Sequence, residues 1–123
     1  MSHMEEVEKR SAALYKAPRV SLDDIKNAIS SKPYLTGADA YDAAGGFVGA
    51  VPADRDALSV LTICLIVMKN GFTIIGKSAP ASPENFDAEY GKELAYEDAI
   101  KQLWPLMGFA LKDRLASCTN VIG

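Results

Sequence analysis

Residues 58–69, LSVLTICLIVMK, run directly into Asn70-Gly71 and then into residues 72–78, FTIIGKS. β-Branched residues occupy both alternating sets of positions in the first segment, which predicts a central strand covered on both faces. Asn and Gly tolerate the positive φ angles of a type I′ turn, so the stretch predicts an antiparallel β-hairpin. A two-stranded hairpin cannot bury two apolar faces alone. Helices must therefore pack on it, or a partner chain must extend it.

The N-terminal end of the chain is predicted to be a scar followed by a helix or arm. Residues 1–4, MSHM, resemble a cleavage scar from an expression vector. Residues 5–18 contain good helix formers with only a weak apolar stripe, so a helix or a flexible arm is expected there. Residues 19–123 are expected to form a single α+β domain.

Two helices are expected between this arm and the hairpin. A Ser-Leu-Asp-Asp capping sequence predicts a helix over residues 22–31, with its apolar residues on one face. A shorter helix over residues 38–44, capped by Thr36 or Gly37, would end at a Gly-Gly pair. Residues 47–52 fit either a strand or a loop, and the polar residues 53–57 lead into the hairpin without a predicted element.

A long helical region follows the hairpin. Ser82 and Pro83 suit an N-cap and a first helical position, with a second cap at Asp87, and residues 88–117 keep helical apolar spacing. Pro105 interrupts this pattern at a cost of about 3 kcal/mol, which predicts two helices meeting at a kink, or a break at Trp104-Pro105. The expected fold class is therefore α+β, with N-terminal helices, a central antiparallel β-hairpin and a C-terminal helix pair kinked at Pro105. The apolar second face of the hairpin predicts a homo-oligomer.

Length and charge exclude several classes of protein. The chain has 123 residues and a formal net charge of -3, with 13 Lys plus Arg against 16 Asp plus Glu. This balance argues against a nucleic-acid-binding protein, which needs a basic face. The longest apolar run, residues 60–68, is shorter than the roughly 20 residues of a membrane-spanning helix, and no signal peptide precedes it. Cys64 and Cys118 are too few for a disulfide framework, so reduced thiols in a cytoplasm are expected.

Few residues suit catalysis or metal binding. The one histidine, His3, lies within the MSHM scar, which leaves the native chain without the commonest general base and metal ligand. We therefore expect no catalytic residues, no bound metal and no cofactor. Acidic residues gather within residues 84–98, but Lys92 and Lys101 lie nearby, which favours a solvated surface. An enzymatic alternative would require these carboxylates to cluster around an ion.

One formal motif matches a nucleotide-binding loop. Residues 71–78, GFTIIGKS, fit the P-loop pattern G-x-x-x-x-G-K-[ST]. A working P-loop has a tight loop at the x positions and a helix that starts at the Lys-Ser end. Here Phe-Thr-Ile-Ile favours a strand, and Ala79-Pro80 follows where the helix should begin. The match is therefore interpreted as a strand of the hairpin.

Four residues are candidates for a binding site. Asn85 and Phe86 lie at a helix start, where they could meet a ligand or serve as a cap and a packing residue. Trp104 could contact a partner, although its apolar neighbours favour a core anchor. Lys77 completes the candidate set as a cation for an anionic ligand.

Several short stretches together resemble a known family. They are LTIC at 61–64, KNGFT at 69–73, GKS at 76–78, SPENFD at 82–87, LWPLMGF at 103–109, and, nearer the N-terminus, APRV at 17–20, DI at 24–25 and YLTGAD at 34–39. On these residues the chain is identified as a member of a family of small tailed-phage and prophage proteins catalogued by gene-product number, forty-nine and sixty-six in its founding phages. The family pattern has an acidic residue within the Gly-x-Ser of the second strand, whereas this chain has Lys77. The resemblance therefore implies that the P-loop match is specific to this member of the family.

The resemblance implies a phage or prophage origin and expression in the host bacterial cytoplasm, and it supplies no catalytic residues. Together with the small size and the missing histidine, it favours a non-enzymatic accessory protein that binds a host macromolecule, for example to blunt a defence system. The alternative is a sponge, a protein that sequesters a nucleotide signal without cleaving it. The site of the sponge would combine Asn85, Lys77 and a subunit interface.

Overall fold

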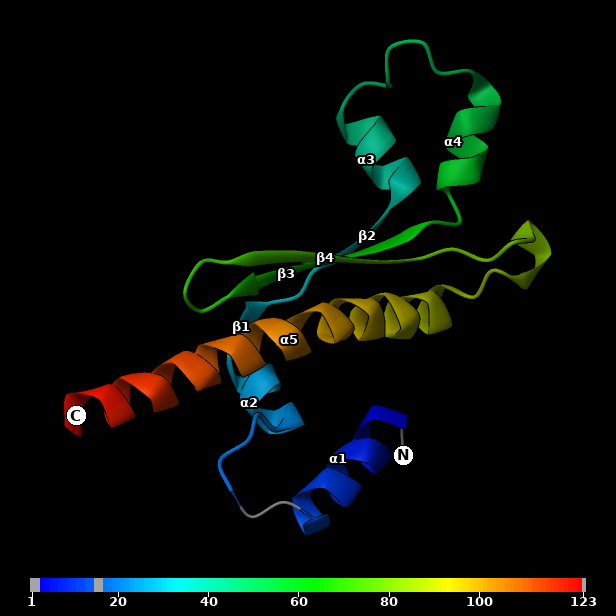
Figure 1. The fold of residues 1–123 in the computed structure, drawn as a ribbon. Coiled ribbons are helices and arrows are strands. Elements are labelled where there is room, and N and C mark those ends of the chain that lie inside the picture. Colours follow the sequence, from blue (N-terminus) through cyan, green and yellow to red (C-terminus); the bar gives the residue numbers. More distant parts are fainter. Residues whose placement is uncertain (1–2, 15–16, 123) are drawn as a thin grey trace.

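The computed structural model describes residues 3–14 and 17–122, and for residues 11–14 and 119–122 it describes the backbone alone. It confirms the α+β fold, with helices at the N-terminal end, an antiparallel sheet and a long C-terminal helix (Figure 1). The elements in chain order are α1 (His3–Leu14), α2 (Leu22–Asn27), β1 (Ile29–Ser31), β2 (Tyr34–Thr36), α3 (Gly37–Ala43), α4 (Pro52–Leu58), β3 (Thr62–Met68), β4 (Thr73–Ser78), η1 (Pro83–Asn85) and α5 (Ala88–Ile122).

Strand β3 is the centre of the sheet, as the sequence predicts. It pairs antiparallel with β4 along one edge, where Leu65 lies opposite Ile75. Along its other edge lie β2 and β1, and Leu35 of β2 lies opposite Ile63. The predicted hairpin is therefore extended by two short strands from the N-terminal part of the same chain.

Strand β1 corrects the helix predicted over residues 22–31. Helix α2 ends before Ala28, and Ile29 lies opposite Met68 of β3. The Lys69 N–H donates to the Ala28 carbonyl at 2.8 Å, which ties the end of α2 to the hairpin. Apolar spacing at three residues fits a helix as well as a strand, so pairing with β3 decides the outcome.

The hairpin turn differs from the predicted type I′ turn. Gly71 has a φ of 88°, but Asn70 does not have a positive φ, since all positive-φ residues in the described chain are glycines. The Gly71 N–H donates to the Met68 carbonyl at 2.9 Å, and the Met68 N–H donates to the Phe72 carbonyl at 2.8 Å. This pattern is a three-residue loop in which a type I turn is followed by a left-handed glycine.

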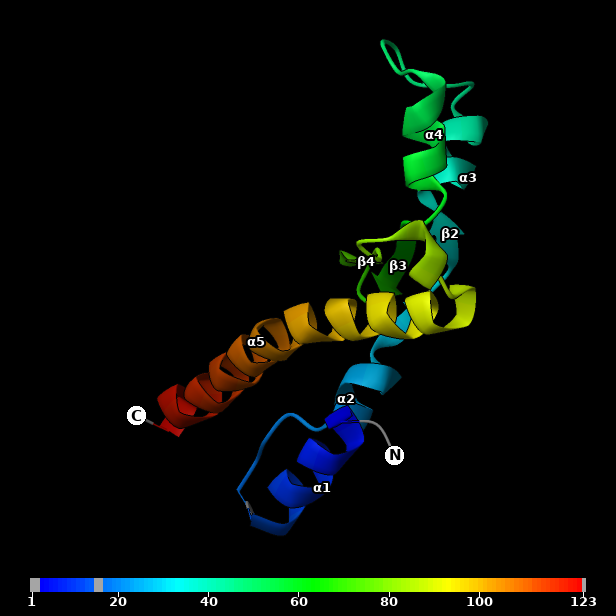
Figure 2. The same cartoon turned by 90° about the vertical axis from the view of Figure 1, so that its right-hand side faces the viewer.

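Helix α5 covers one face of the sheet (Figures 1 and 2). The core cluster consists of Leu22, Ile25, Cys64, Ile66, Met68, Ile74, Ala95, Ala99, Ile100 and Leu103. Pro105 lies inside α5, so the predicted helix pair is one helix, and Figure 2 shows its axis bending between the yellow and red parts. Leu103 is buried, and Trp104 and Met107 pack against the core. This packing on both sides of the proline offsets the missing backbone donor.

Among the described elements, α5 is the helix that packs extensively on β3 and β4, so one face of these strands is covered within the chain. Covering of the second face by a partner chain stays a prediction. Side chains alternate along β3 and β4, so every second residue points away from α5. We call this surface the open face. Its apolar residues are Leu35, Ile63, Leu65, Val67 and Ile75, and its polar residues on β4 are Thr73 and Lys77. Leu65 is 36% exposed and Ile75 is 60% exposed.

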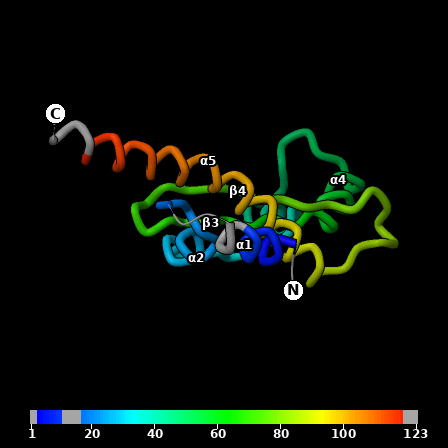
Figure 3. Tube along the Cα trace, turned by 60° about the horizontal axis from the view of Figure 1, so that its bottom comes forward, coloured from blue at the N-terminus to red at the C-terminus, as the bar shows by residue number. Residues whose placement is uncertain are grey.

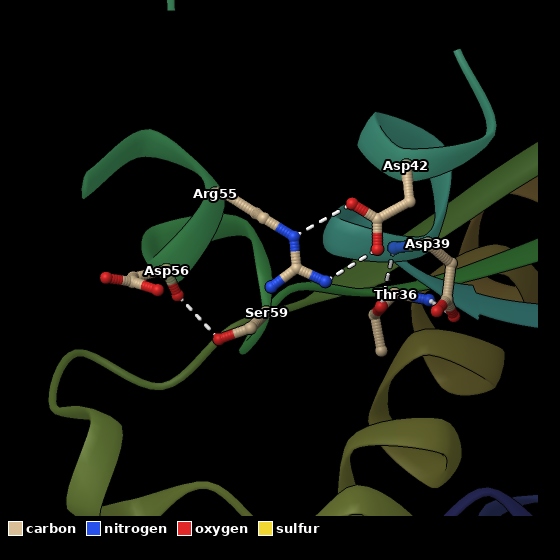
Figure 4. Close-up of polar contacts among 6 residues, drawn as sticks. All are labelled: Thr36, Asp39, Asp42, Arg55, Asp56 and Ser59. Carbon is tan, nitrogen blue, oxygen red and sulfur yellow. Dashed lines mark hydrogen bonds and ion pairs between the residues drawn. The ribbon is translucent and has the colours of Figure 1, made fainter. Parts of the chain in front are cut away.

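A lobe of two short helices, residues 37–58, stands on the side of the sheet opposite α5 (Figures 1 and 2). Helix α3 begins with a capping box, in which Thr36 Oγ1 accepts from the Asp39 N–H at 3.0 Å (Figure 4). Helix α4 lies where no element was predicted. Arg55 of α4 donates from Nε and Nη2 to the two carboxylate oxygens of Asp42 in α3, at 2.8 and 2.6 Å (Figure 4).

Helix α1 and the C-terminal part of α5 extend beyond the sheet and the lobe. Helix α1 contacts α2, and Arg19 forms an ion pair of 2.9 Å with Glu8 of α1. The C-terminal part of α5 runs on past the hairpin (Figures 1 and 3). Leu106 and Phe109 on that part are 44% and 69% exposed. Over the residues described, no helix has the length and apolar content to cross a membrane.

Candidate functional site

A hollow of about 290 Å³ lies at the end of the sheet where β3 begins, β4 ends and α5 starts. We call it the first hollow. Its walls combine apolar side chains with two aromatic rings and several polar groups. The lining residues are Val60, Thr62, Ser78, Ala79, Pro80, Ala81, Asn85, Phe86, Asp87, Tyr90, Gly91 and Leu94.

A second hollow of about 260 Å³ shares Thr62 and Phe86 with the first. Its further lining residues are Tyr34, Leu35, Thr36, Asp39, Ala88 and Lys92. Phe86 therefore stands between a mainly apolar space and one that carries an ammonium group. Together the two hollows fall within the range of about 300–1,000 Å³ that is typical of small-molecule sites.

The close approach of α5 to β3 gives the first hollow its floor. Thr62 is 4% exposed and is the polar residue buried beneath the start of α5. A Cβ atom at Gly91 would lie 2.7 Å from Thr62 Oγ1, so any larger residue would push the helix away from the strand. Glycine at this helix position thus sets the depth of the hollow.

The segment that carries Asn85 and Phe86 is held by its own backbone. The Asn85 N–H donates to the Ser82 carbonyl at 3.0 Å, and the Phe86 N–H donates to the Pro83 carbonyl at 3.1 Å. The Ser82 side chain does not cap η1, in contrast to the expected N-cap, and contacts Glu84 instead.

Helix α5 has a cap of its own at Asp87, as the sequence predicts. Asp87 Oδ1 accepts from the Tyr90 N–H at 3.0 Å, and the Asp87 carbonyl accepts from the Gly91 N–H at 2.8 Å. A carboxylate therefore already occupies part of this helix start. Side chains around the hollow, rather than backbone amides, are the groups available to a ligand.

The structure brings together two of the four candidate residues. Asn85 and Phe86 both line the first hollow. Lys77 is exposed on the open face and is not a lining residue, although its neighbour Ser78 is. Trp104 packs against the core, as the structural alternative expects.

Sequence reasoning missed Tyr90 and Lys92. Tyr90 is 58% exposed in the first hollow, and Lys92 Nζ lies 5.9 Å from the centre of the Tyr34 ring in the second. Lys92 Nζ also lies 3.5 Å from Glu89 Oε1. Both residues read as ordinary surface positions of a helix. The sequence feature that could have identified them is their position three and five residues after Asp87, at the predicted start of the helix.

Burial keeps the groups beneath the second hollow neutral. It raises the pKa of Tyr34 to about 12, with Cys64 adding to the effect. Burial also raises the pKa of the Cys64 thiol, despite a hydrogen bond with Tyr34 that lowers it. Because the thiolate is the reactive form, Cys64 acts as a core residue, as the sequence indicates.

The P-loop pattern has no nucleotide-binding loop in the structure. Residues 71–78 form the end of the turn and strand β4, and no helix begins at Lys77. The interpretation as a hairpin strand is confirmed. Within the described part of the chain, no group of three or more His, Cys, Asp or Glu side chains is placed to hold a metal ion. The site offers aromatic rings, an amide, hydroxyls and an ammonium group for binding, and its two carboxylates, Asp39 and Asp87, already accept from backbone N–H groups.

Comparison with known proteins bears out the family resemblance. The profile of the family described as Phage protein (N4 Gp49/phage Sf6 gene 66) matches residues 20–115. No curated protein and no solved structure matches the chain significantly.

Proposed function

Because the chain belongs to the phage protein family of N4 Gp49 and Sf6 gene 66, we propose that it is a non-enzymatic phage accessory protein that sequesters a nucleotide-sized ligand. One observation carries this proposal. The first hollow combines Asn85 with the rings of Phe86 and Tyr90, and the adjoining hollow supplies Lys92. A nucleotide signal of host defence is the ligand we favour, which makes the protein a counter-defence sponge.

The side chains match the parts of a nucleotide. Phe86 and Tyr90 offer ring faces, and stacking of a base on an aromatic side chain contributes about 1–3 kcal/mol. The Asn85 amide has both donors and an acceptor, as the edge of a base requires. Lys92 lies on the far side of Phe86, where it can pair with a phosphate.

Sequestration without cleavage follows from the groups beside the hollows. The single histidine, His3, belongs to α1 and lines neither hollow. The Cys64 thiol stays protonated at neutral pH because burial raises its pKa. A bound ligand therefore meets groups that orient it and groups that neutralise its charge, and it is expected to leave chemically unchanged.

The test uses a small-molecule extract of infected, defence-proficient cells. The extract should raise the melting temperature of the wild-type protein, because a ligand that binds the folded state stabilises it. Asn85→Ala and Phe86→Ala should abolish this increase, whereas Lys112→Ala, on the projecting part of α5, should retain it. Asn85 is exposed, so Asn85→Ala tests the site even where Phe86→Ala fails to fold. An increase that survives both site variants would refute the proposed site.

Binding of a host protein is a second candidate, favoured by the projecting part of α5. Leu106 and Phe109 lie three residues apart there and are 44% and 69% exposed. Apolar side chains at this spacing are the anchors with which a helix binds an apolar groove. Phe109→Asp should then abolish recovery of a stoichiometric host protein from infected cells, and Phe86→Ala should not. The opposite pattern would favour the ligand site.

A further inference from the structure

We propose that the open face is the interface of a symmetric homodimer, in which the lobe of each copy packs over the hairpin end of the other. The occupant of the face is thus a second copy of this chain. Three features of the molecule support this interface, namely the apolar face, the occupied edge of β4 and the opposite charges of lobe and hairpin. It is independent of the ligand proposed above.

The open face has the composition of a buried surface. Ile63, Leu65 and Val67 of β3 face away from α5, beside Ile75 of β4. Ile75 is 60% exposed, and Phe72 at the hairpin end is 52% exposed. Two sheets can pack face to face at about 10 Å through such side chains.

Two backbone groups on the free edge of β4 are already bonded to side chains of α5, which disfavours addition of a partner strand there and favours association through the face. The outward Lys77 N–H donates to Asp98 Oδ2 at 3.0 Å, and the outward Ile75 carbonyl accepts from Gln102 Nε2 at 2.7 Å. Both acceptor and donor come from α5, one helical turn apart. Side chains that occupy edge groups prevent strand addition.

Charge favours a second copy as the occupant. Residues 62–78 contain Lys69 and Lys77 and no acidic residue. Residues 37–58, the lobe, contain four Asp and one Arg. Each copy therefore has a basic hairpin and an acidic lobe. The acidic lobe of one copy complements the basic hairpin of the other.

The shape permits both contacts at once. The lobe stands on the open side of the sheet, near the start of β3, and the hairpin turn lies at the other end of β3 (Figures 1 and 2). A two-fold axis through the open face sets the two hairpins antiparallel. The lobe of each copy then lies over the Lys69 end of its partner, which is the reciprocal contact of an isologous interface.

Sedimentation velocity over a range of protein concentrations tests this dimer. The wild-type protein should be dimeric, and Ile75→Asp should weaken dimerisation at least about tenfold, as loss of a central contact does. Ile75 is exposed, and circular dichroism would verify that Ile75→Asp remains folded. Phe109 belongs to α5, which lies on the side of the sheet opposite the open face, so Phe109→Asp should dimerise as the wild type does. A wild-type monomer, or a dimer broken by Phe109→Asp and not by Ile75→Asp, would overturn the proposal.

A charge swap tests the contact between lobe and hairpin. Lys69→Glu and Asp56→Lys should each weaken the dimer, and the double variant should restore it, because the pair of charges is reversed. The single-variant effects should shrink at high salt, since exposed charges are screened. Single variants that leave dimerisation unchanged at low salt would contradict this orientation of the two copies.

Discussion

Gly76 of β4 shows how one residue holds a helix against the sheet. A Cβ atom there would overlap the Ala95 carbonyl oxygen and lie 2.7 Å from the Ala99 nitrogen of α5. Gly76→Ala should therefore force α5 away from β4 and lower the free energy of unfolding by about 1–3 kcal/mol or more. Urea denaturation monitored by circular dichroism measures this change.

Gly108 provides the matched control on the same helix. Apart from its chain neighbours and the backbone of its own helix, no atom of the described residues lies within 4 Å of a Cβ at this position, so Gly108→Ala should raise the free energy of unfolding by about 0.5–1 kcal/mol through helix propensity. Equal stability of Gly76→Ala and the wild type would contradict the described contact between α5 and β4.

Tyr34 makes stability depend on alkaline pH. Burial, followed by the influence of Cys64, raises its pKa from the ordinary 10.0 to about 12. The folded state favours the neutral phenol, so this contribution to stability is complete below pH 10.0 and disappears as pH rises to about 12.

The expected result is a steeper loss of stability in this pH window for the wild type than for Tyr34→Phe, which has no proton to lose. Urea unfolding at several alkaline pH values measures it, and absorbance at 295 nm follows the tyrosinate. Tyr90→Phe is the control, because Tyr90 is exposed and should leave the pH dependence unchanged. Identical alkaline profiles for the wild type and Tyr34→Phe would be incompatible with a buried, late-titrating Tyr34.

At the scale of elements, the lobe depends on one ion pair between its helices. Arg55 holds the pKa of the Asp42 carboxyl below its usual range through their hydrogen bonds (Figure 4). A lowered carboxyl pKa contributes stability at neutral pH that is lost as pH falls through that pKa. Asp42→Asn should therefore speed amide hydrogen exchange in α3 and α4 and leave β3 protected. Exchange that rises equally in β3, or that does not change in the lobe, would contradict this role.

Sequence patterns predicted the elements whose signals are local. Alternating apolar residues and Asn-Gly specified the hairpin, and the capping residue Thr36 opened α3. Strand β1 could not be predicted, since its three residues are strand only through pairing with β3. Helix α4 has no apolar stripe, and contacts such as Arg55 with Asp42 stabilise it. Pro105 indicated a break, but packing against the core keeps α5 continuous.

The candidate site shows the same division between local and long-range information. Asn85 and Phe86 were predictable because Pro83 and the cap at Asp87 mark a helix start in the local sequence. The hollow that they share with Thr62 and Leu94 depends on where α5 lies against β3, which no local pattern encodes. Lys77 was grouped with them as a cation for an anionic ligand, yet strand alternation directs it to the open face.

For the whole molecule, the two faces of the sheet separate two roles. Helix α5 covers one face and forms the hollows at its start, and the lobe rises on the other side of the sheet, near the start of β3 (Figure 2). Substitutions in the two regions should therefore act independently. Asn85→Ala should lose the ligand and keep the dimer, whereas Ile75→Asp should lose the dimer and keep the fold.

Native mass spectrometry after incubation with lysate of infected, defence-proficient cells tests whether the protein sequesters a nucleotide-sized ligand, because one spectrum reports the bound mass and the number of sites. We expect an added mass of nucleotide size for the wild type, no such mass for Asn85→Ala, and recovery of the ligand unaltered after denaturation. A spectrum of the folded protein without added mass, or a ligand recovered in cleaved form, would contradict this proposal.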